Sequence, residues 1–242
     1  MKKTLAVIVV VLVGLLTACG PVSSLNPLFT SEDVVFDPGL LGDWTQDDPD
    51  DFSLRFEKDG SKGYRVIDTE FDGDGSAKHT EYRAHLVDLN GHRFLDVVPA
   101  QVAAQSASYQ MSMASGEQAS NDSRLAGSAK GSQLLRLGDG FYAEVTPGPS
   151  TTANAASLNL RQAHWIFRID GDGSTLSLAS LDQDWLQKAI DQGQVSVSSA
   201  VTSDASKDLV LTADTQELQR FVIEHADDEE AFPQTTQLYR PH

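Results

Sequence analysis

The chain has one cysteine, few aromatic side chains and few basic ones, and each shortage narrows what the protein can be. Cys19 is the only cysteine among 242 residues, so the chain cannot form an internal disulfide. Lys and Arg number 18 against 35 Asp and Glu, which gives a formal net charge of −17. A domain this acidic is repelled by the phosphates of nucleic acid, so nucleic acid is excluded as a partner.

Familiar catalytic signatures are also missing from the sequence. It contains no Gly-x-Ser-x-Gly nucleophile elbow, no His-Glu-x-x-His zinc pair, no phosphate-binding loop and no dinucleotide fingerprint. We therefore predict a protein that is not an enzyme and needs no cofactor. The alternative is a hydrolase or metal-dependent enzyme whose residues are distant from one another in the sequence.

The first residues have the order of an export signal. A short basic stretch precedes an apolar run over residues 5–16, which is too short to span a bilayer comfortably. Leu16-Thr17-Ala18-Cys19 resembles the lipobox of bacterial lipoproteins. That resemblance implies that residues 1–18 are a signal peptide, and that Cys19 becomes the lipid-modified first residue. Two or more acyl chains then hold the mature protein on its membrane.

The residues after Cys19 indicate which membrane holds the protein and where its folded domain begins. Gly20 stands where aspartate would resemble an inner-membrane retention signal. In a host with two membranes, this favours the outer membrane, with the domain facing the periplasm. Residues 19–39 are small and polar with three prolines, and we expect a flexible tether there. Residues 40–242 are expected to form one β-rich domain.

From residue 40 onward, the hydrophobic pattern has the two-residue period of half-buried strands. Phe52, Leu54 and Phe56 alternate with polar residues, and Asn90-Gly91 is a strong hairpin signal. Strands are predicted over residues 52–57, 64–69, 79–86, 93–98, 133–137, 141–145, 164–169, 175–181, 209–211 and 235–240. Consecutive short strands joined by tight turns favour an antiparallel meander, so the fold class is mainly β.

Two short helices and one long insertion interrupt this pattern. Asp182 is the predicted N-cap of the first helix, which ends at Gly193. Thr212 or Asp214 opens the second helix, where Glu217 completes a capping box with Asp214. Residues 100–132 are rich in Ala, Ser, Gln and Gly without any period, and we predict a long insertion or mobile loop there.

Gly42-Asp43-Trp44, at the start of the first strand, resembles the opening motif of the calycin superfamily, which includes the lipocalins. In that family the tryptophan closes the floor of a β-barrel, and an arginine from the last strand packs across its ring. Arg240 lies in the last predicted strand and is the expected partner of Trp44. The resemblance implies a calycin-like barrel, and a strongly bent sheet with helices on one side is the alternative. Residues 34–44 are also similar to uncharacterised bacterial lipoproteins.

The aromatic side chains are candidates for lining a cavity of such a barrel. The set comprises Phe52, Phe56, Tyr64, Tyr82, Phe94, Trp165 and Phe167. Our predicted residues for binding a small hydrophobic ligand are Trp44, Phe56, Tyr64, Tyr82 and Phe167. A filled interior is the alternative, because small barrels are only wide enough for their own side chains. In that case we expect an envelope protein to bind at the surface.

Two patterns are compatible with a metal site. One side of a predicted strand carries His79, Glu81 and His85, which could hold zinc together with a nearby His92. The plainer interpretation is that these polar side chains are solvated. Asp-Gly-Asp-Gly-Ser occurs at Asp72 and at Asp170, which is similar to a calcium loop. Neither stretch has the glutamate that such a loop needs downstream, so we predict tight turns. His164 and His225 are expected at the edge of the core.

Overall fold

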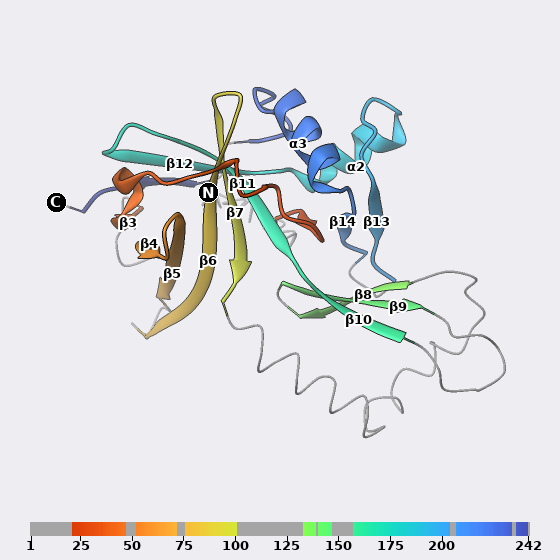
Figure 1. The fold of residues 1–242 in the computed structure, drawn as a ribbon, viewed down its shortest axis with the longest axis horizontal. Helices are drawn as coiled ribbons and strands as arrows, with labels where there is room; N and C mark the ends of the chain where they lie inside the picture. The colour runs from red at the N-terminus through yellow and green to blue at the C-terminus, as the bar shows by residue number, and fades with distance from the viewer. Residues whose placement is uncertain are drawn as a thin grey trace, which may run out of the picture.

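The computed structural model describes residues 21–46, 52–71, 76–100, 133–138, 140–146, 157–203, 207–233 and 236–241. Eight antiparallel strands in it form a closed barrel (Figure 1). They are β3 (Gly42–Thr45), β4 (Phe52–Asp59), β5 (Gly63–Phe71), β6 (Ala77–Leu89), β7 (His92–Pro99), β11 (His164–Gly171), β12 (Thr175–Ser180) and β15 (Thr236–Tyr239). Each strand pairs with the next, and β15 pairs with both β12 and β3. The predicted mainly-β fold with a calycin-like barrel and two short helices is therefore confirmed, and the barrel is closed rather than a bent open sheet.

The two ends of the barrel differ. Tight turns join β4 to β5, β6 to β7 and β11 to β12 at one end, where Asn90 and Gly91 take φ values of 56° and 88°. Such values are those of the predicted Asn-Gly hairpin turn. We call this the closed end. The opposite end, where β5 stops at Phe71, β7 at Pro99 and β12 at Ser180, is called the open end.

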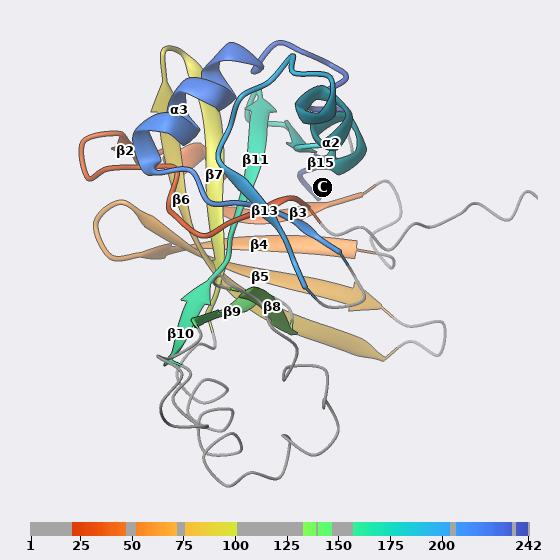
Figure 2. The ribbon, with the colours of Figure 1, turned by 90° about the vertical axis from the view of Figure 1, so that its right-hand side faces the viewer.

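Helices cover one outer wall of the barrel (Figure 2), and an outer apolar core between them and the wall is separate from the core inside the barrel. Asp182 caps α2 (Gln183–Asp191) by accepting from the Trp185 amide at 2.7 Å, and Asp214 caps α3 (Thr215–Glu224) through the Glu217 amide at 2.8 Å. Both predicted caps are confirmed. The helices bury Leu186 and Leu218 against the outer wall, where Phe94 points away from the interior. No helix in these ranges is long and apolar enough to cross a bilayer.

A second, three-stranded sheet lies beside the open end (Figure 1). It consists of β8 (Gln133–Gly138), β9 (Phe141–Thr146) and β10 (Ser157–Gln162), in the order β10-β9-β8. The strands predicted over residues 133–137 and 141–145 are therefore present, but they belong to this second sheet and not to the barrel. These strands satisfy their backbone groups with one another, and Gln162 leads directly into β11. Most of the predicted insertion, residues 101–132, lies outside the described residues.

The N-terminal segment is built into the fold. β1 (Ser23–Ser24) lies between β11, to which it is antiparallel, and β14 (Leu209–Leu211), to which it is parallel; β13 (Ser199–Val201) completes this extension of the sheet. β2 (Val34–Val35) pairs with β6, and the 3-10 helix η1 (Pro38–Leu40) leads into β3. From Pro21 onward the predicted flexible tether is therefore wrong. Val22 and Leu28 are buried in the outer core, which fixes the segment on the barrel wall.

Candidate functional site

Trp44 and Arg240 seal the closed end of the barrel. The Trp44 side chain is 1% exposed, and its indole N–H donates to the carbonyl of Leu40 at 2.8 Å. The Arg240 guanidinium carbon lies 4.3 Å from the centroid of the Trp44 ring, so the contact expected from the calycin resemblance is present. Arg240 also donates to the carbonyls of Leu41, Gly39 and Gly173.

The first position of the Gly-x-Trp motif is glycine for a physical reason. Gly42 takes a φ of +108°, which side-chain-bearing residues rarely adopt, and a Cβ there would lie 3.0 Å from a nitrogen of Arg240. Glycine therefore lets the arginine approach the backbone at the start of β3. The Gly-x-Trp motif therefore supplies both the tryptophan ring and the space in which the guanidinium group of Arg240 covers that ring.

Above this seal the barrel interior is filled. Inward side chains include Phe56 and Tyr64, which are 2% and 0% exposed, together with Leu86, Leu95, Ile169, Leu176 and Leu238. The Tyr64 hydroxyl also donates to the Asp37 carbonyl and accepts from the Asp37 amide. Three of the predicted ligand residues, Trp44, Phe56 and Tyr64, are thus enclosed by packed neighbours. This half of the barrel matches the filled interior that we gave as the alternative.

The open end is lined differently, by aromatic side chains that are only partly buried. Paired residues on neighbouring strands point to the same face of a sheet. Trp165 pairs with Val97 and Phe167 pairs with Leu95, whose side chains belong to the interior core. Phe52 and Tyr82 complete the set, and the rings of Tyr82 and Trp165 meet edge to face at 5.6 Å. Two predicted ligand residues, Tyr82 and Phe167, therefore belong to this set of inward-facing, partly buried aromatics.

One carboxylate also points into the open end. Asp68 on β5 pairs with Leu54 on β4 and with Thr80 on β6, so all three side chains face the interior. Its Oδ1 atom is buried and has no hydrogen-bond partner. The pKa of Asp68 is raised to about 6, mainly by burial and also by the negative charge of Glu70, while the positive charge of Lys78 opposes this rise. Aromatic walls around an unpartnered acceptor are what a site for a small amphipathic molecule requires.

The predicted zinc residues share one face of β6 but each has another partner. His79 lies 3.0 Å from the hydroxyl of Thr69, and Glu81 forms an ion pair with Arg65 that lowers the pKa of the Glu81 carboxyl. His85 packs against Phe29, with ring centroids 4.5 Å apart, and burial lowers the pKa of its imidazole. Within the described ranges no three such side chains are placed to hold a metal.

The second Asp-Gly-Asp-Gly stretch is a tight turn, as predicted. Asp172 accepts from the amides of Ser174 and Thr175 and from the Ser174 hydroxyl, and these bonds lower the pKa of its carboxyl. Its oxygens are thereby committed to the turn between β11 and β12. The first such stretch, residues 72–75, lies outside the described residues.

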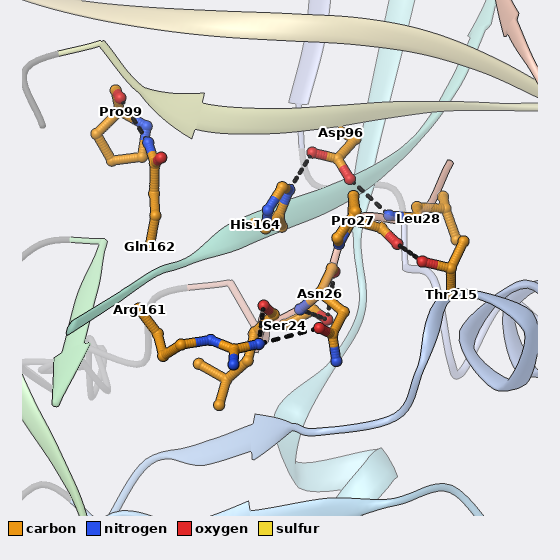
Figure 3. A network of polar contacts seen from close by, with 11 residues as sticks. Ser24, Asn26, Pro27, Leu28, Asp96, Pro99, Arg161, Gln162, His164 and Thr215 are labelled. Atoms are coloured by element: carbon orange, nitrogen blue, oxygen red, sulfur yellow. Dashed lines mark hydrogen bonds and ion pairs between the residues drawn. The ribbon is translucent and has the colours of Figure 1, made fainter. Parts of the chain in front are cut away.

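A buried polar network ties the N-terminal segment to the outer wall (Figure 3). Asp96 on β7 is 1% exposed; its carboxylate bonds to the imidazole Nδ1 of His164 at 2.7 Å and accepts from the Leu28 amide at 2.7 Å. Arg161 and Thr215 hold the carbonyls of Leu25 and Pro27. Both carboxylate oxygens of Asp96 thus fix the position of other groups, which gives this aspartate–histidine pair a structural role. Sequence analysis missed Asp96, although a charged residue inside Phe94-Leu95-Asp96-Val97-Val98 was a signal.

A groove of about 440 Å³ lies outside the barrel, between the N-terminal segment and the β4–β5 turn. Phe29, Asp59, Arg83 and His85 line it, and Lys62 spans it by donating to the Val34 carbonyl at 2.6 Å. Charged side chains stand among the residues that line this groove, and Lys62 crosses it, whereas the open end of the barrel is lined mainly by aromatic rings. We therefore regard the open end, centred on Asp68, as the candidate site.

No protein-family model matches this chain, and neither a curated protein nor a solved structure matches it.

Proposed function

We propose that this protein is a bacterial envelope lipoprotein, anchored to its membrane through Cys19, whose barrel binds a small and mainly apolar molecule at its open end. The binding role is non-enzymatic and needs no cofactor. In a host with two membranes, the anchor lies in the outer membrane and the domain faces the periplasm. The observation that carries the binding role is the group of partly exposed aromatic side chains that face the barrel interior at the same end as Asp68.

The contrast between the two halves of the barrel supports this proposal. Apolar side chains at the closed end are almost fully buried by one another, which is how a barrel stabilises itself. At the open end, Phe52, Tyr82, Trp165 and Phe167 keep part of their surface accessible. Covering such surface with a ligand is favourable by about 25 cal/mol per Å² of apolar area removed from water.

The test fills the open end without removing any core side chain. Thr80 faces the interior beside Asp68, and Thr69, one position from Asp68 on β5, faces the outside. We expect Thr80→Trp to occupy the space that the ligand needs, and Thr69→Trp to leave it free. Binding of the apolar fluorophore N-phenyl-1-naphthylamine to protein expressed from residue 20 should fall at least about tenfold in Thr80→Trp, which is about 1.4 kcal/mol.

The Thr69→Trp variant is the matched control, because it adds the same ring at the same level of the barrel on its other face. Native mass spectrometry of the unsubstituted protein after exposure to a lipid extract provides a second measurement. A reproducible adduct of lipid size supports a carrier or sensor. Equal fluorophore binding by the two variants, or a bare chain mass after exposure, would overturn a ligand site at the open end.

A further inference from the structure

The open end is negatively charged on its inside. Asp68 is two residues from Glu70 along β5, and Glu70 pairs with Lys78, whose ammonium lies 3.7 Å from the Glu70 carboxylate. Lys78 is 71% exposed and is turned to this neighbour, while Oδ1 of Asp68 has no partner. Apart from Lys78, the inward-facing residues described at this end carry no basic group.

The walls around Asp68 are suited to a cation. Aromatic rings present negative potential on their faces, and aromatic cages recognise quaternary ammonium groups for this reason. The indole N–H of Trp165 is already used, because it donates to the Ser23 hydroxyl at 3.0 Å. A ligand therefore meets the ring system of Trp165 and Tyr82 rather than that hydrogen-bond donor.

We infer that the ligand of the open end is an amphiphile with a cationic ammonium group, which pairs with the Asp68 carboxylate while its apolar part covers the aromatic walls. This inference rests on the proposed binding function and adds the chemical class of the ligand. A buried acceptor with no partner in the protein is satisfied by the ligand's charged group. An anionic head group would meet Asp68 as a like charge.

The test compares three probes with the same eight-carbon chain: octyltrimethylammonium, 1-octanol and octanoate. We expect the protein expressed from residue 20 to bind octyltrimethylammonium about tenfold more tightly than 1-octanol, measured by titration calorimetry at pH 7.5. Octanoate should bind most weakly. Asp68→Asn, which keeps the shape of the side chain, should abolish the preference for the ammonium probe and leave 1-octanol binding unchanged.

Asp43→Asn is the matched control, because it also removes one negative charge, but on the outer face, where Asp43 pairs with Arg55. It should retain the ammonium preference. The unsubstituted protein offers a test without any variant. Since the pKa of Asp68 is about 6, lowering the pH from 7.5 to 5 should weaken ammonium binding about tenfold and leave 1-octanol binding unchanged.

The outcomes separate this inference from the proposed function. Equal affinity for the ammonium and the alcohol, or an effect of Asp43→Asn as large as that of Asp68→Asn, would overturn the cationic ligand while leaving an apolar site intact. Tighter binding of octanoate would also overturn it. Failure of all three probes to bind to folded protein would instead contradict the proposed function itself.

Discussion

Arg240 connects three segments at the closed end of the barrel through a single side chain. It covers the ring of Trp44, donates to two carbonyls in the η1–β3 region and to the carbonyl of Gly173 in the β11–β12 turn. The last strand is thereby fixed to the first one and to the turn beside them. A lysine could supply the charge but not several N–H groups in a planar fork.

We therefore predict that Arg240→Ala destabilises the protein by about 2–4 kcal/mol, because a cation–π contact and three hydrogen bonds are lost together. Urea unfolding followed by tryptophan fluorescence measures this change. Arg240→Lys should recover less than half of the loss. Arg220→Ala is the control, since Arg220 is exposed on α3 and bonds only to its own helix. A loss for Arg240→Ala no larger than that of the control would contradict this role.

Single residues also show how much of the candidate site could be predicted from the sequence. Trp44 and Arg240 were predictable as partners from a motif and a position in the last strand. Tyr82 and Phe167 were predictable as inward aromatics, but the sequence could not separate them from Phe56 and Tyr64, which are buried. The depth of a side chain along the barrel axis depends on how neighbouring strands are staggered, and the hydrophobic pattern of a single strand does not contain this information. Asp68 continues the alternation of Tyr64 and Val66, so its inward direction could have been inferred.

Among the elements, the N-terminal segment departs furthest from its prediction. β1 contains only two residues, both serines, and a pair of serines shows no hydrophobic period. Its stability comes from partners more than 130 residues away, in β11 and β14. Helices and hairpins, in contrast, depend on neighbours in the sequence, so their caps and turns were predicted correctly at Asp182, Asp214 and Asn90.

Asp96 provides the test of how firmly this segment is held. Asp96→Ala removes the acceptor of the buried Leu28 amide and the partner of His164, and we predict a loss of about 2–4 kcal/mol in the free energy of unfolding. The Leu28 amide should also exchange its hydrogen faster. Asp33→Ala serves as the comparison on the same segment, because Asp33 accepts from Thr30 at the exposed surface and from Gln219 at a partly buried position, and its loss should be smaller, about 1 kcal/mol. Similar losses in both variants would show that Asp96 does not hold the segment.

At the scale of the whole molecule, the barrel could be predicted because hairpins between neighbouring strands build most of it. The segments added outside the barrel could not be predicted in this way. All eight barrel strands follow one another around the circumference in chain order, with long interruptions only before β11 and β15. Both interruptions build structure against the outer wall or beside the open end: β8 to β10 in the first, and α2, β13, β14 and α3 in the second. Which edges these additions pair with is decided by contacts remote in sequence, such as Ser203 with Leu134.

The fixed N-terminal segment also limits how the domain can sit on a membrane if Cys19 carries the anchor. Only Gly20 and Pro21 separate Cys19 from the buried Val22, and three Cα–Cα steps span at most about 11 Å. Ser23, Val210 and Ala200 lie in register across β1, β14 and β13, which places β13 about 10 Å from β1. Val201, 48% exposed at the end of β13, is therefore close to where the chain leaves the domain. Ser61 lies in the β4–β5 turn at the closed end.

We predict that the lipidated protein holds Val201 near the bilayer and Ser61 away from it. Cys19 is the one cysteine of the chain and its sulfur would be blocked by the proposed thioether, so Val201→Cys and Ser61→Cys would each provide a single thiol for a fluorescent label. In phosphatidylcholine vesicles that contain a nitroxide-labelled lipid, the label at residue 201 should be quenched much more strongly than the label at residue 61. Equal quenching would mean that the domain turns freely on its anchor, as a flexible tether would allow. Inserting a Gly-Ser linker after Cys19 should remove the difference, because the short reach that orients the domain is then lost.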